Sequence, residues 1–256
     1  MKKFTVITIC LNEPRLERTC ESIVHQSFQD FEWFVIDGGS EKKTLDTFEK
    51  YKYRMDYFVS KKNQGIYDAM NIGLANASGE WVNFMHAGDC FSNFDILGQA
   101  RELLAIYGGF DVLHGILQYD GDRNFRGHSF VRGQSFVTDD QITREFWLNK
   151  TIPHPPAVFY KRILFNKFGD FDVSFKDCSC HEYNLRLYFR GCLFKHIDCV
   201  VAKYDNSGAS WRNMMHHEER MRILHKYYSK NEISLNTQIK FKNLRARVIS
   251  PKQYNV

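Results

Sequence analysis

Long apolar runs are missing from this 256-residue sequence, and no uncharged run approaches the roughly 18 residues that span a bilayer. The start, MKKFTVITICLNE, reaches a polar pair without a small-residue cleavage site, so we expect no signal peptide. Compositional bias is also missing, since 43% of the residues are hydrophobic, 25% charged and 15% aromatic. This balance excludes a disordered or collagen-like chain and predicts a folded protein with a sizeable core.

Paired C-x-x-C spacing is missing as well. The seven cysteines lie at positions 10, 20, 90, 178, 180, 192 and 199, several of them inside apolar segments. An odd number without pairing argues against a disulfide framework and favours the reducing cytoplasm. Cys178, Cys180 and His181 form a C-x-C-H cluster, but a zinc site needs a second ligand pair, so we interpret this cluster as structural.

An excess of charge of one sign is absent until residue 216. From His216 to Val256 nine Lys and Arg face three Glu, whereas the first 215 residues are about neutral. Such a tail could contact phosphate-bearing lipid or nucleic acid, but for so modest an excess a solvated helical face is the favoured interpretation. We therefore expect no nucleic-acid partner and keep peripheral membrane contact as an open alternative.

Strand and helix patterns alternate through about residue 118. The segments typical of strands are FTVITICL, FEWFVID, DYFVS, WVNFM and DVLHGILQY. Amphipathic or charged helical stretches lie between most of them, which predicts an α/β fold with a mostly parallel central sheet flanked by helices. From about 110 to 205 the pattern loosens around TIPHPPAVFYKR and a helical HEYNLRLYFRG, and the final segment is expected to be helical.

Polar groups follow three of the expected strands, as Asn12-Glu13, Asp37-Gly-Gly-Ser and His86-Ala-Gly-Asp89. The carboxyl ends of parallel strands meet on one rim, where ligands gather. Carboxylates clustered there repel each other unless a cation or hydrogen-bond donors intervene. The sequence contains neither G-x-G-x-x-G nor G-x-x-x-x-G-K-[ST]. We therefore expect phosphate binding through Mg²⁺ or Mn²⁺, or through scattered cations.

Two long segments carry a family resemblance: VITICLNEPRLERTCESIVHQSFQDFEWFVIDGGS and GIYDAMNIGLANASGEWVNFMHAGDCF. They resemble the family 2 glycosyltransferases with the glycosyltransferase-A fold, most closely the bacterial branch that assembles polysaccharide and lipopolysaccharide. The resemblance is strong over about 4–95 and weaker over about 150–210. It implies one catalytic domain over 1–215, with a nucleotide-sugar-binding half (1–109) and an acceptor half (110–215), followed by a basic helical extension (216–256).

The resemblance also implies a set of donor contacts. The nucleotide-sugar-binding residues that carry over are Thr8, Asn12, Glu13, Asp37, Gly65, Asp68 and Asn71. Thr8, Asn12 and Glu13 would lie against the nucleoside, and Asp37 would accept a hydrogen bond from the base or ribose. The last three match the family's G-I-Y-D-A-M-N-x-G segment, whose helix lines the donor pocket. An ordinary strand residue at Thr8 and a helix cap at Asp68 are the alternatives.

The metal expectation rests on Asp89, which falls where the family carries its Asp-x-Asp motif. One strong oxygen ligand with water completing the octahedron is enough for Mn²⁺ or Mg²⁺. His86 departs from the acidic first position and is expected to form a wall of the pocket. Lys61, Lys62 and Asn63 also depart from the family's pattern. The identity of the donor sugar nucleotide is therefore left open, with a UDP-sugar favoured.

An inverting transfer needs a base for the acceptor hydroxyl. The family carries this base as a carboxylate at the start of a helix, and CHEYNLRLYFR matches that pattern with Glu182, so Glu182 is the expected catalytic residue. Asp177 is the competing base, and a merely dipole-favoured carboxylate is the alternative for Glu182. His154 would lie on the acceptor side, and the segment 206–210 resembles a loop that closes over the donor.

The sequence therefore predicts a metal-dependent inverting glycosyltransferase. It would move a sugar from a nucleotide diphosphate sugar to a saccharide acceptor during cell-surface polysaccharide biosynthesis. The family resemblance implies that this acceptor is lipid-linked. Such an enzyme would be cytoplasmic, with contact to the inner face of the membrane left open. One alternative is a catalytically weakened nucleotide-sugar-binding subunit of an assembly complex. The other is a sugar-nucleotide pyrophosphorylase, but that enzyme needs a glycine-rich phosphate loop near the N-terminus, and the segment ITICLNEPR is not such a loop.

Overall fold

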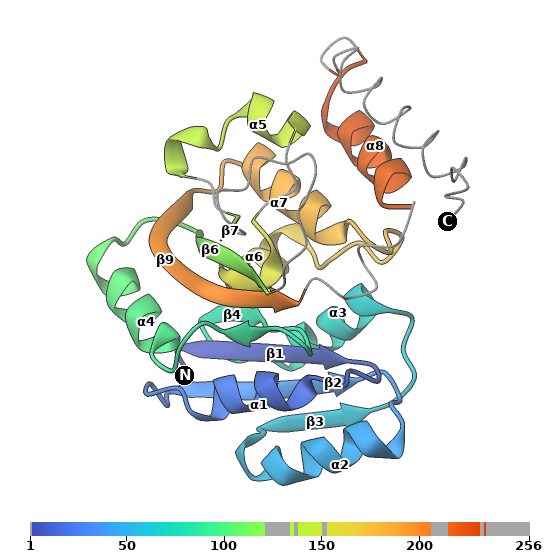
Figure 1. Ribbon diagram of the computed structural model, residues 1–256. Coiled ribbons are helices and arrows are strands. Elements are labelled where there is room, and N and C mark those ends of the chain that lie inside the picture. Colours follow the sequence, from blue (N-terminus) through green and yellow to red (C-terminus); the bar gives the residue numbers. More distant parts are fainter. Residues whose placement is uncertain are drawn as a thin grey trace, which may run out of the picture.

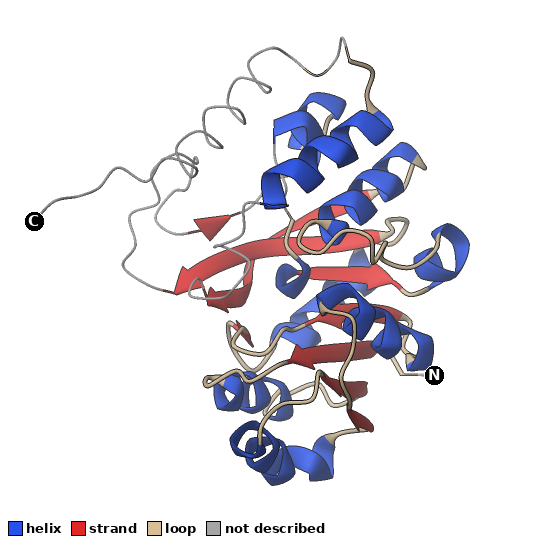
Figure 2. Cartoon of the chain, turned by 90° about the vertical axis from the view of Figure 1, so that its right-hand side faces the viewer, coloured by secondary structure: helices blue, strands red, loops and turns tan. Residues whose placement is uncertain are grey.

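The computed structural model describes residues 2–120, 134–135, 138–149, 153–205, 215–230 and 233. These residues form one twisted sheet with helices on both faces (Figures 1 and 2). The strand order is β3-β2-β1-β4-β8-β6-β9-β5, with β7 paired to β6. The α/β fold predicted from the alternating patterns is confirmed.

The strands of the first half pair in parallel. Its elements are β1 (Phe4–Cys10), α1 (Leu16–Val24), β2 (Phe31–Asp37), α2 (Lys42–Tyr51), the 3₁₀ turn η1 (Lys52–Arg54), β3 (Tyr57–Ser60), α3 (Ile66–Asn76) and β4 (Trp81–Phe84). The register sets Cys10 opposite Asp37 and Asp37 opposite Ser60. The loops that follow β1, β2 and β3 therefore begin side by side on one edge of the sheet.

The rest of the chain, from β5 onward, adds antiparallel pairing. Its elements are β5 (Cys90–Phe91), α4 (Ile96–Ile106), β6 (Val112–Asp120), β7 (Gln134–Ser135), η2 (Asp139–Gln141), α5 (Arg144–Asn149), η3 (Pro155–Ala157), β8 (Val158–Lys161), α6 (Ile163–Phe168), α7 (Ser179–Phe189), β9 (Phe194–Asp205) and α8 (Met215–Tyr227). Strand β8 runs antiparallel to β4 and β6 and so joins the halves. The sequence analysis does not predict β9, because charged residues such as Lys195 and Lys203 interrupt its apolar positions.

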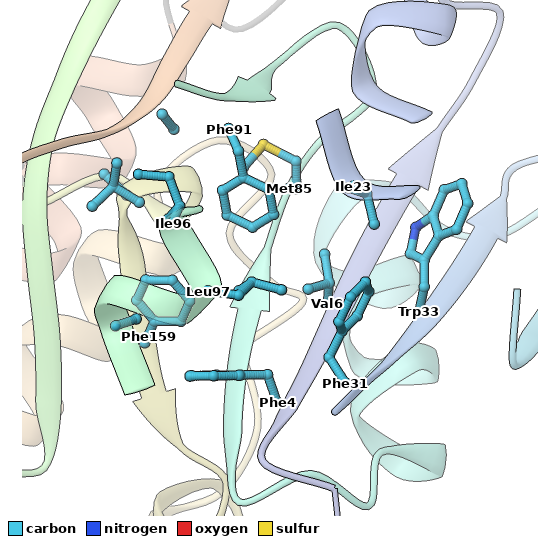
Figure 3. Close-up of a cluster of buried hydrophobic side chains, with 14 of the residues drawn as sticks. Phe4, Val6, Ile23, Phe31, Trp33, Met85, Phe91, Ile96, Leu97 and Phe159 are labelled. Carbon is cyan, nitrogen blue, oxygen red and sulfur yellow. The ribbon is translucent and has the colours of Figure 1, made fainter. Parts of the chain in front are cut away.

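Strand β1 is buried on both faces, and its alternating side chains feed two cores. Phe4 and Val6 pack with α1, α2 and α4 on one face (Figure 3). Ile7 and Ile9 pack with α3, α6 and α7 on the other. On that second face α3 approaches closely, since a Cβ at Gly73 would lie 2.6 Å from Cγ2 of Ile7. A larger residue at position 73 would therefore push the helix off the sheet.

Helix α8 lies against α7 at the far end of the molecule (Figure 1). Leu224 and Tyr228 are buried in a third cluster with Trp147, and Met221 is partly buried against it. The described start of the expected C-terminal extension thus packs on the acceptor half. No helix in the described ranges is long and apolar enough to cross a membrane.

A buried histidine lies in the strand pair β6–β9. His114 is fully buried, and among the described residues neither of its ring nitrogens has a hydrogen-bond partner. Its ring lies 5.3 Å from that of His196, between ring centroids. Burial, aided by the nearby His196, lowers the pKa of His114 to about 3. Protonation of this side chain is therefore incompatible with the folded core.

We expect acid to destabilise the protein through His114. The unfolded chain binds a proton at this residue below a pKa of about 6.5, whereas the folded chain stays neutral, so stability is fully present above that pH. Below it, His114 lowers the free energy of unfolding by about 1.4 kcal/mol per pH unit. Urea unfolding between pH 7 and 5 measures this slope.

The variant His114→Leu should reduce the slope, and His25→Gln, which alters an exposed histidine, should leave it unchanged. An equal slope in wild type and His114→Leu would contradict the prediction.

Candidate active site

Asp37 shapes the rim at the end of β2. Its carboxylate is fully buried and accepts hydrogen bonds from the backbone N–H of Ser40 at 2.8 Å and of Gly39 at 3.1 Å. The hydroxyls of Ser60, at 2.6 Å, and of Ser40 also donate to it. Three of these four donors reach Oδ2, and only the Ser40 hydroxyl reaches Oδ1. Asp37 thus fixes the loop after β2, and its expected contact with the base or ribose stays a prediction.

Asn12 ties the loop after β1 to the loop after β2. It adopts a positive φ of 52°, and its backbone N–H donates to Oγ of Ser40 at 2.8 Å. Its side-chain Oδ1 accepts the N–H of Glu41 at 2.7 Å. Asn63, from the loop after β3, lies close to Gly38, since a Cβ there would be 3.4 Å from Asn63 Nδ2. Three loops therefore form one continuous rim.

Thr8 lies below this rim, in the core. Its side chain is fully buried, and Oγ1 accepts a hydrogen bond from Nε1 of Trp33 at 3.0 Å. This contact satisfies the indole N–H, which would be costly to bury unpaired. The Thr8 hydroxyl thus contacts Trp33, and its expected place against the nucleoside stays a prediction.

Helix α1 holds the loop 86–89 through one hydroxyl. Thr19 donates to the carbonyl of Asp89 at 2.6 Å and accepts the N–H of Gly88 at 2.9 Å. Gly88 has a φ of 94°, and a Cβ on it would lie 3.1 Å from Cδ of Glu13. The loop after β1 and the loop after β4 therefore meet where Gly88 approaches Glu13, whose carboxylate also lies 3.5 Å from Nε of Arg15. Asp89 follows Gly88 and is buried at this corner between the two loops.

The donor atoms of this corner suit a divalent cation. Burial lowers the pKa of His86 to about 4, so its imidazole is neutral at physiological pH and able to bind a metal. Nε2 of His86 is buried and lacks a hydrogen-bond partner in the described part of the chain. A carboxylate with an imidazole favours Mn²⁺ over Mg²⁺. Across the described residues no three His, Cys, Asp or Glu side chains form a cluster for a metal, so phosphate oxygens would have to complete such a site.

The start of α3 carries the three residues of the G-I-Y-D-A-M-N segment. Gly65 has a φ of 124°, which permits the turn into the helix. Oδ2 of Asp68 accepts the N–H of Gln64, which precedes the N-cap residue Gly65, at 2.8 Å. The amide of Asn71 donates to the carbonyl of Phe171 at 2.9 Å and accepts its N–H at 3.1 Å. These residues shape α3 and attach it to the acceptor half, and their donor contacts stay predictions.

A small pocket of about 160 Å³ opens between the start of α3 and the segment 173–176. It is lined by Gln64, Gly65, Ile66, Tyr67, Asp68, Val173, Phe175 and Lys176. Asp177 lies next to it, because the hydroxyl of Tyr67 donates to the Asp177 carbonyl at 2.8 Å. The competing base is therefore beside the helix expected to line the donor pocket.

Glu182 has a different environment. Its carboxylate is fully buried and accepts hydrogen bonds from Lys226 at 2.7 Å, from Arg186 and from the hydroxyl of Tyr227. Burial alone would raise the pKa of Glu182, but the bonds from Arg186 and Lys226 outweigh it and hold the pKa below its usual value. A buried carboxylate of lowered pKa is a weak proton acceptor. Glu182 as the base stays a prediction, and these contacts count against it.

Arg186 extends the Glu182 contacts to a third helix. Its Nη1 donates to the carbonyls of Phe168 at 3.0 Å, Gly169 at 3.2 Å and Asp170 at 2.8 Å, where α6 ends. Glu182 and Arg186 thus join α6, α7 and α8. The i,i+4 spacing of this pair is a signal in the sequence, but the partners on α8 follow only from folding.

Only some of the residues expected on the acceptor side lie in the described part of the chain. His154 precedes η3, and its ring stacks on Tyr204 at 6.4 Å between centroids. Its role toward an acceptor stays a prediction. The loop 206–210, with Gly208 as the expected hinge, lies outside the described residues.

Residues 5–169 match the family model "Glycosyl transferase family 2". The chain belongs to glycosyl transferase family 2. It is 28% identical over 210 residues to a PGL/p-HBAD biosynthesis glycosyltransferase of Mycobacterium bovis, covering 80% of this chain and 77% of that protein. It is 32% identical over 206 residues to an uncharacterized glycosyltransferase of Mycobacterium tuberculosis, covering 80% and 75%.

Solved structures share the fold. The S. aureus TarS 1–349 complex with UDP-GlcNAc superposes with a TM-score of 0.72 at 18% identity, over 98% of this chain and 76% of that one. The mannosyltransferase PcManGT from Pyrobaculum calidifontis, in complex with GDP-Man and Mn²⁺, gives 0.65 at 17% identity, over 99% and 76%. The family resemblance, the fold and the expectation of an enzyme are confirmed: the protein is a glycosyltransferase of family 2.

We expect Glu182→Gln to destabilise this glycosyltransferase by about 3 kcal/mol, because removing one partner of a buried ion pair leaves the other charge uncompensated. The folded-state pKa of Glu182 is lowered, so the stabilisation is present at neutral pH and is lost as the pH falls below the ordinary Glu pKa of about 4.3. Urea unfolding at pH 7 and pH 4 measures both effects.

Glu49→Gln is the control, since Glu49 pairs with Lys52 at the surface and should change stability by less than about 0.5 kcal/mol. Equal stability of Glu182→Gln and wild type would show that the network is dispensable.

Proposed function

We propose that the enzyme transfers a sugar from a nucleoside diphosphate sugar, with UDP-sugars favoured, to a saccharide acceptor with inversion at the anomeric carbon. The observation that carries the proposal is the meeting of the loop after β1, at Glu13, with the loop 86–89 that carries Asp89, next to the rim built by Asn12 and Asp37. Such a corner suits a cation-bound diphosphate. The neighbours support the donor class, since TarS is seen with UDP and UDP-GlcNAc and PcManGT with GDP-Man.

A divalent cation, Mn²⁺ or Mg²⁺, is part of the proposal. Asp89 would hold the cation, and the imidazole of His86 is a second candidate ligand because burial lowers its pKa and keeps it neutral. When bound, the cation supplies positive charge that stabilises the leaving diphosphate. Thr19 fixes the backbone on both sides of Asp89 and so pre-sets the direction of its carboxylate.

Asp177, the competing candidate from the sequence, is the base in this proposal. In an inverting transfer the base takes the proton of the acceptor hydroxyl, whose oxygen attacks the anomeric carbon from the face opposite the departing diphosphate. Asp177 lies beside Tyr67 and the pocket at the start of α3. Glu182, predicted from the sequence, would first have to lose its bonds to Lys226 and Tyr227.

The acceptor is proposed to be lipid-linked and to belong to cell-surface polysaccharide assembly. A relative carries the name PGL/p-HBAD biosynthesis glycosyltransferase, which is compatible with a lipid-borne acceptor. His154 would contribute on the acceptor side. The basic residues after 216 would support contact with the inner face of the membrane, and most of them lie outside the described residues.

Asp89→Asn should abolish release of nucleoside diphosphate across a panel of UDP-, GDP- and dTDP-sugars, because the amide loses the charge that binds the cation. EDTA should inactivate the wild type, and added Mn²⁺ should restore it. Asp46→Asn is the control, since Asp46 pairs only with Lys42 at the surface of α2 in the described contacts. Full activity in EDTA would refute metal dependence.

Asp177→Asn should lower kcat by about 10²- to 10⁴-fold while leaving the affinity for UDP nearly unchanged, because it removes the base without altering the donor rim. Glu182→Gln should keep measurable transfer at a temperature where it is folded. Single-turnover rates and UDP titrations distinguish the two. The reverse pattern would restore Glu182 as the base, and activity in both would place the base elsewhere.

A further inference from the structure

Helix α8 supplies a carboxylate to the segment that precedes α7. Glu219 is buried, and its Oε1 accepts the backbone N–H of Lys176. Its Oε2 accepts the N–H of Asp177 at 2.9 Å and that of Cys178 at 3.0 Å. One side chain therefore binds three consecutive backbone N–H groups that lie more than forty residues earlier in the chain.

This contact replaces a cap that the local sequence does not provide. The N-cap residue of α7 is Cys178, which makes no side-chain capping bond. The N–H groups at a helix start have no partner within the helix, and a negative charge is favourable there. Glu219 meets both requirements from another helix. The shape of 176–178 is thus set by α8 and not by its own residues.

The same segment is held from its other side by the donor half. The hydroxyl of Tyr67, on α3, donates to the carbonyl of Asp177 at 2.8 Å. Lys176 lines the pocket together with Gly65 and Asp68. Asp177 therefore lies between two fixed points, one on α3 and one on α8. Loss of the Glu219 contact would remove the hydrogen bonds to the N–H groups of 176–178. It would leave the hydrogen bond from Tyr67 to the Asp177 carbonyl in place.

Helix α8 has other anchors that do not involve Glu219. Ile223 and Leu224 are fully buried against α7. Arg220 Nη2 donates to the carbonyl of Leu148 at 3.0 Å, and the hydroxyl of Tyr228 donates to that of Arg144 at 2.8 Å. A change confined to the Glu219 carboxylate is therefore expected to leave α8 docked.

We propose that Glu219 is a positioning residue for sugar transfer: its carboxylate fixes the backbone of 176–178, which carries Asp177 next to the pocket-lining Lys176. The inference rests on the proposed function, in which Asp177 is the base. It adds α8, which lies beyond the residues that match the family model, to the elements on which catalysis depends.

The test compares Glu219→Gln with Glu218→Gln in the full chain. Gln keeps the size of Glu but loses the charge and one acceptor oxygen. Glu218, its neighbour on the exposed face of α8, is the matched control. Hydrogen exchange at the amides of 176–178, UDP affinity by calorimetry, and kcat with the nucleotide sugar that the wild type turns over are measured for each protein.

In Glu219→Gln we expect these amides to exchange about tenfold faster and kcat to fall about 10- to 100-fold, because a displacement of about 1 Å at a reacting group can cost that much. UDP affinity should stay within about twofold, since the donor rim is untouched. Glu218→Gln should match the wild type in all three measurements.

Two results would overturn the positioning role. A Glu219→Gln enzyme with wild-type kcat would show that the contact is dispensable for transfer. Equal losses of UDP affinity, kcat and thermal stability would show a merely structural role. A wild type that releases no nucleoside diphosphate from any nucleotide sugar would instead refute the proposed function, and the positioning role with it.

Discussion

The burial of β1 on both faces is the constraint on which the rest of the molecule depends. Because Phe4 and Val6 enter one core and Ile7 and Ile9 the other, the strand cannot slip by one residue without exchanging its two sets of side chains. Its register fixes β2 on one side and β4 on the other. The loops that follow these strands are thus delivered to one rim.

Helix α3 connects the sheet to the backbone of residues 171–177. Gly73 lets it lie directly on Ile7, while Asn71 and Tyr67 bond the backbones of Phe171 and Asp177. Both bonds span about a hundred residues of sequence, and both leave from the segment that resembles the donor-binding helix. The pocket between the halves therefore owes its shape to α3.

Three carboxylates near α7 show how folding assigns different tasks to similar side chains. Glu182 is enclosed by cations and a tyrosine, so its charge stabilises the meeting of three helices. Glu219 is equally buried, but backbone N–H groups surround it and it shapes the chain. Asp177 lies beside the pocket. Burial and partners, rather than position in a motif, separate an ion pair, a cap and a candidate base.

The sequence by itself determined the α/β alternation, the polar strand ends and the family, because apolar periodicity and turn residues act over a few neighbouring positions. It also placed Asn12, Asp37 and Asp89 at strand ends, since register follows from buried strands. Only the tertiary structure decided that Thr8 bonds Trp33 in the core, that Asn71 joins the two halves, and that β9 completes the sheet. It likewise decided that Lys226 reaches Glu182 and Glu219 reaches 176–178, because such contacts join residues about forty positions apart and no local pattern encodes them.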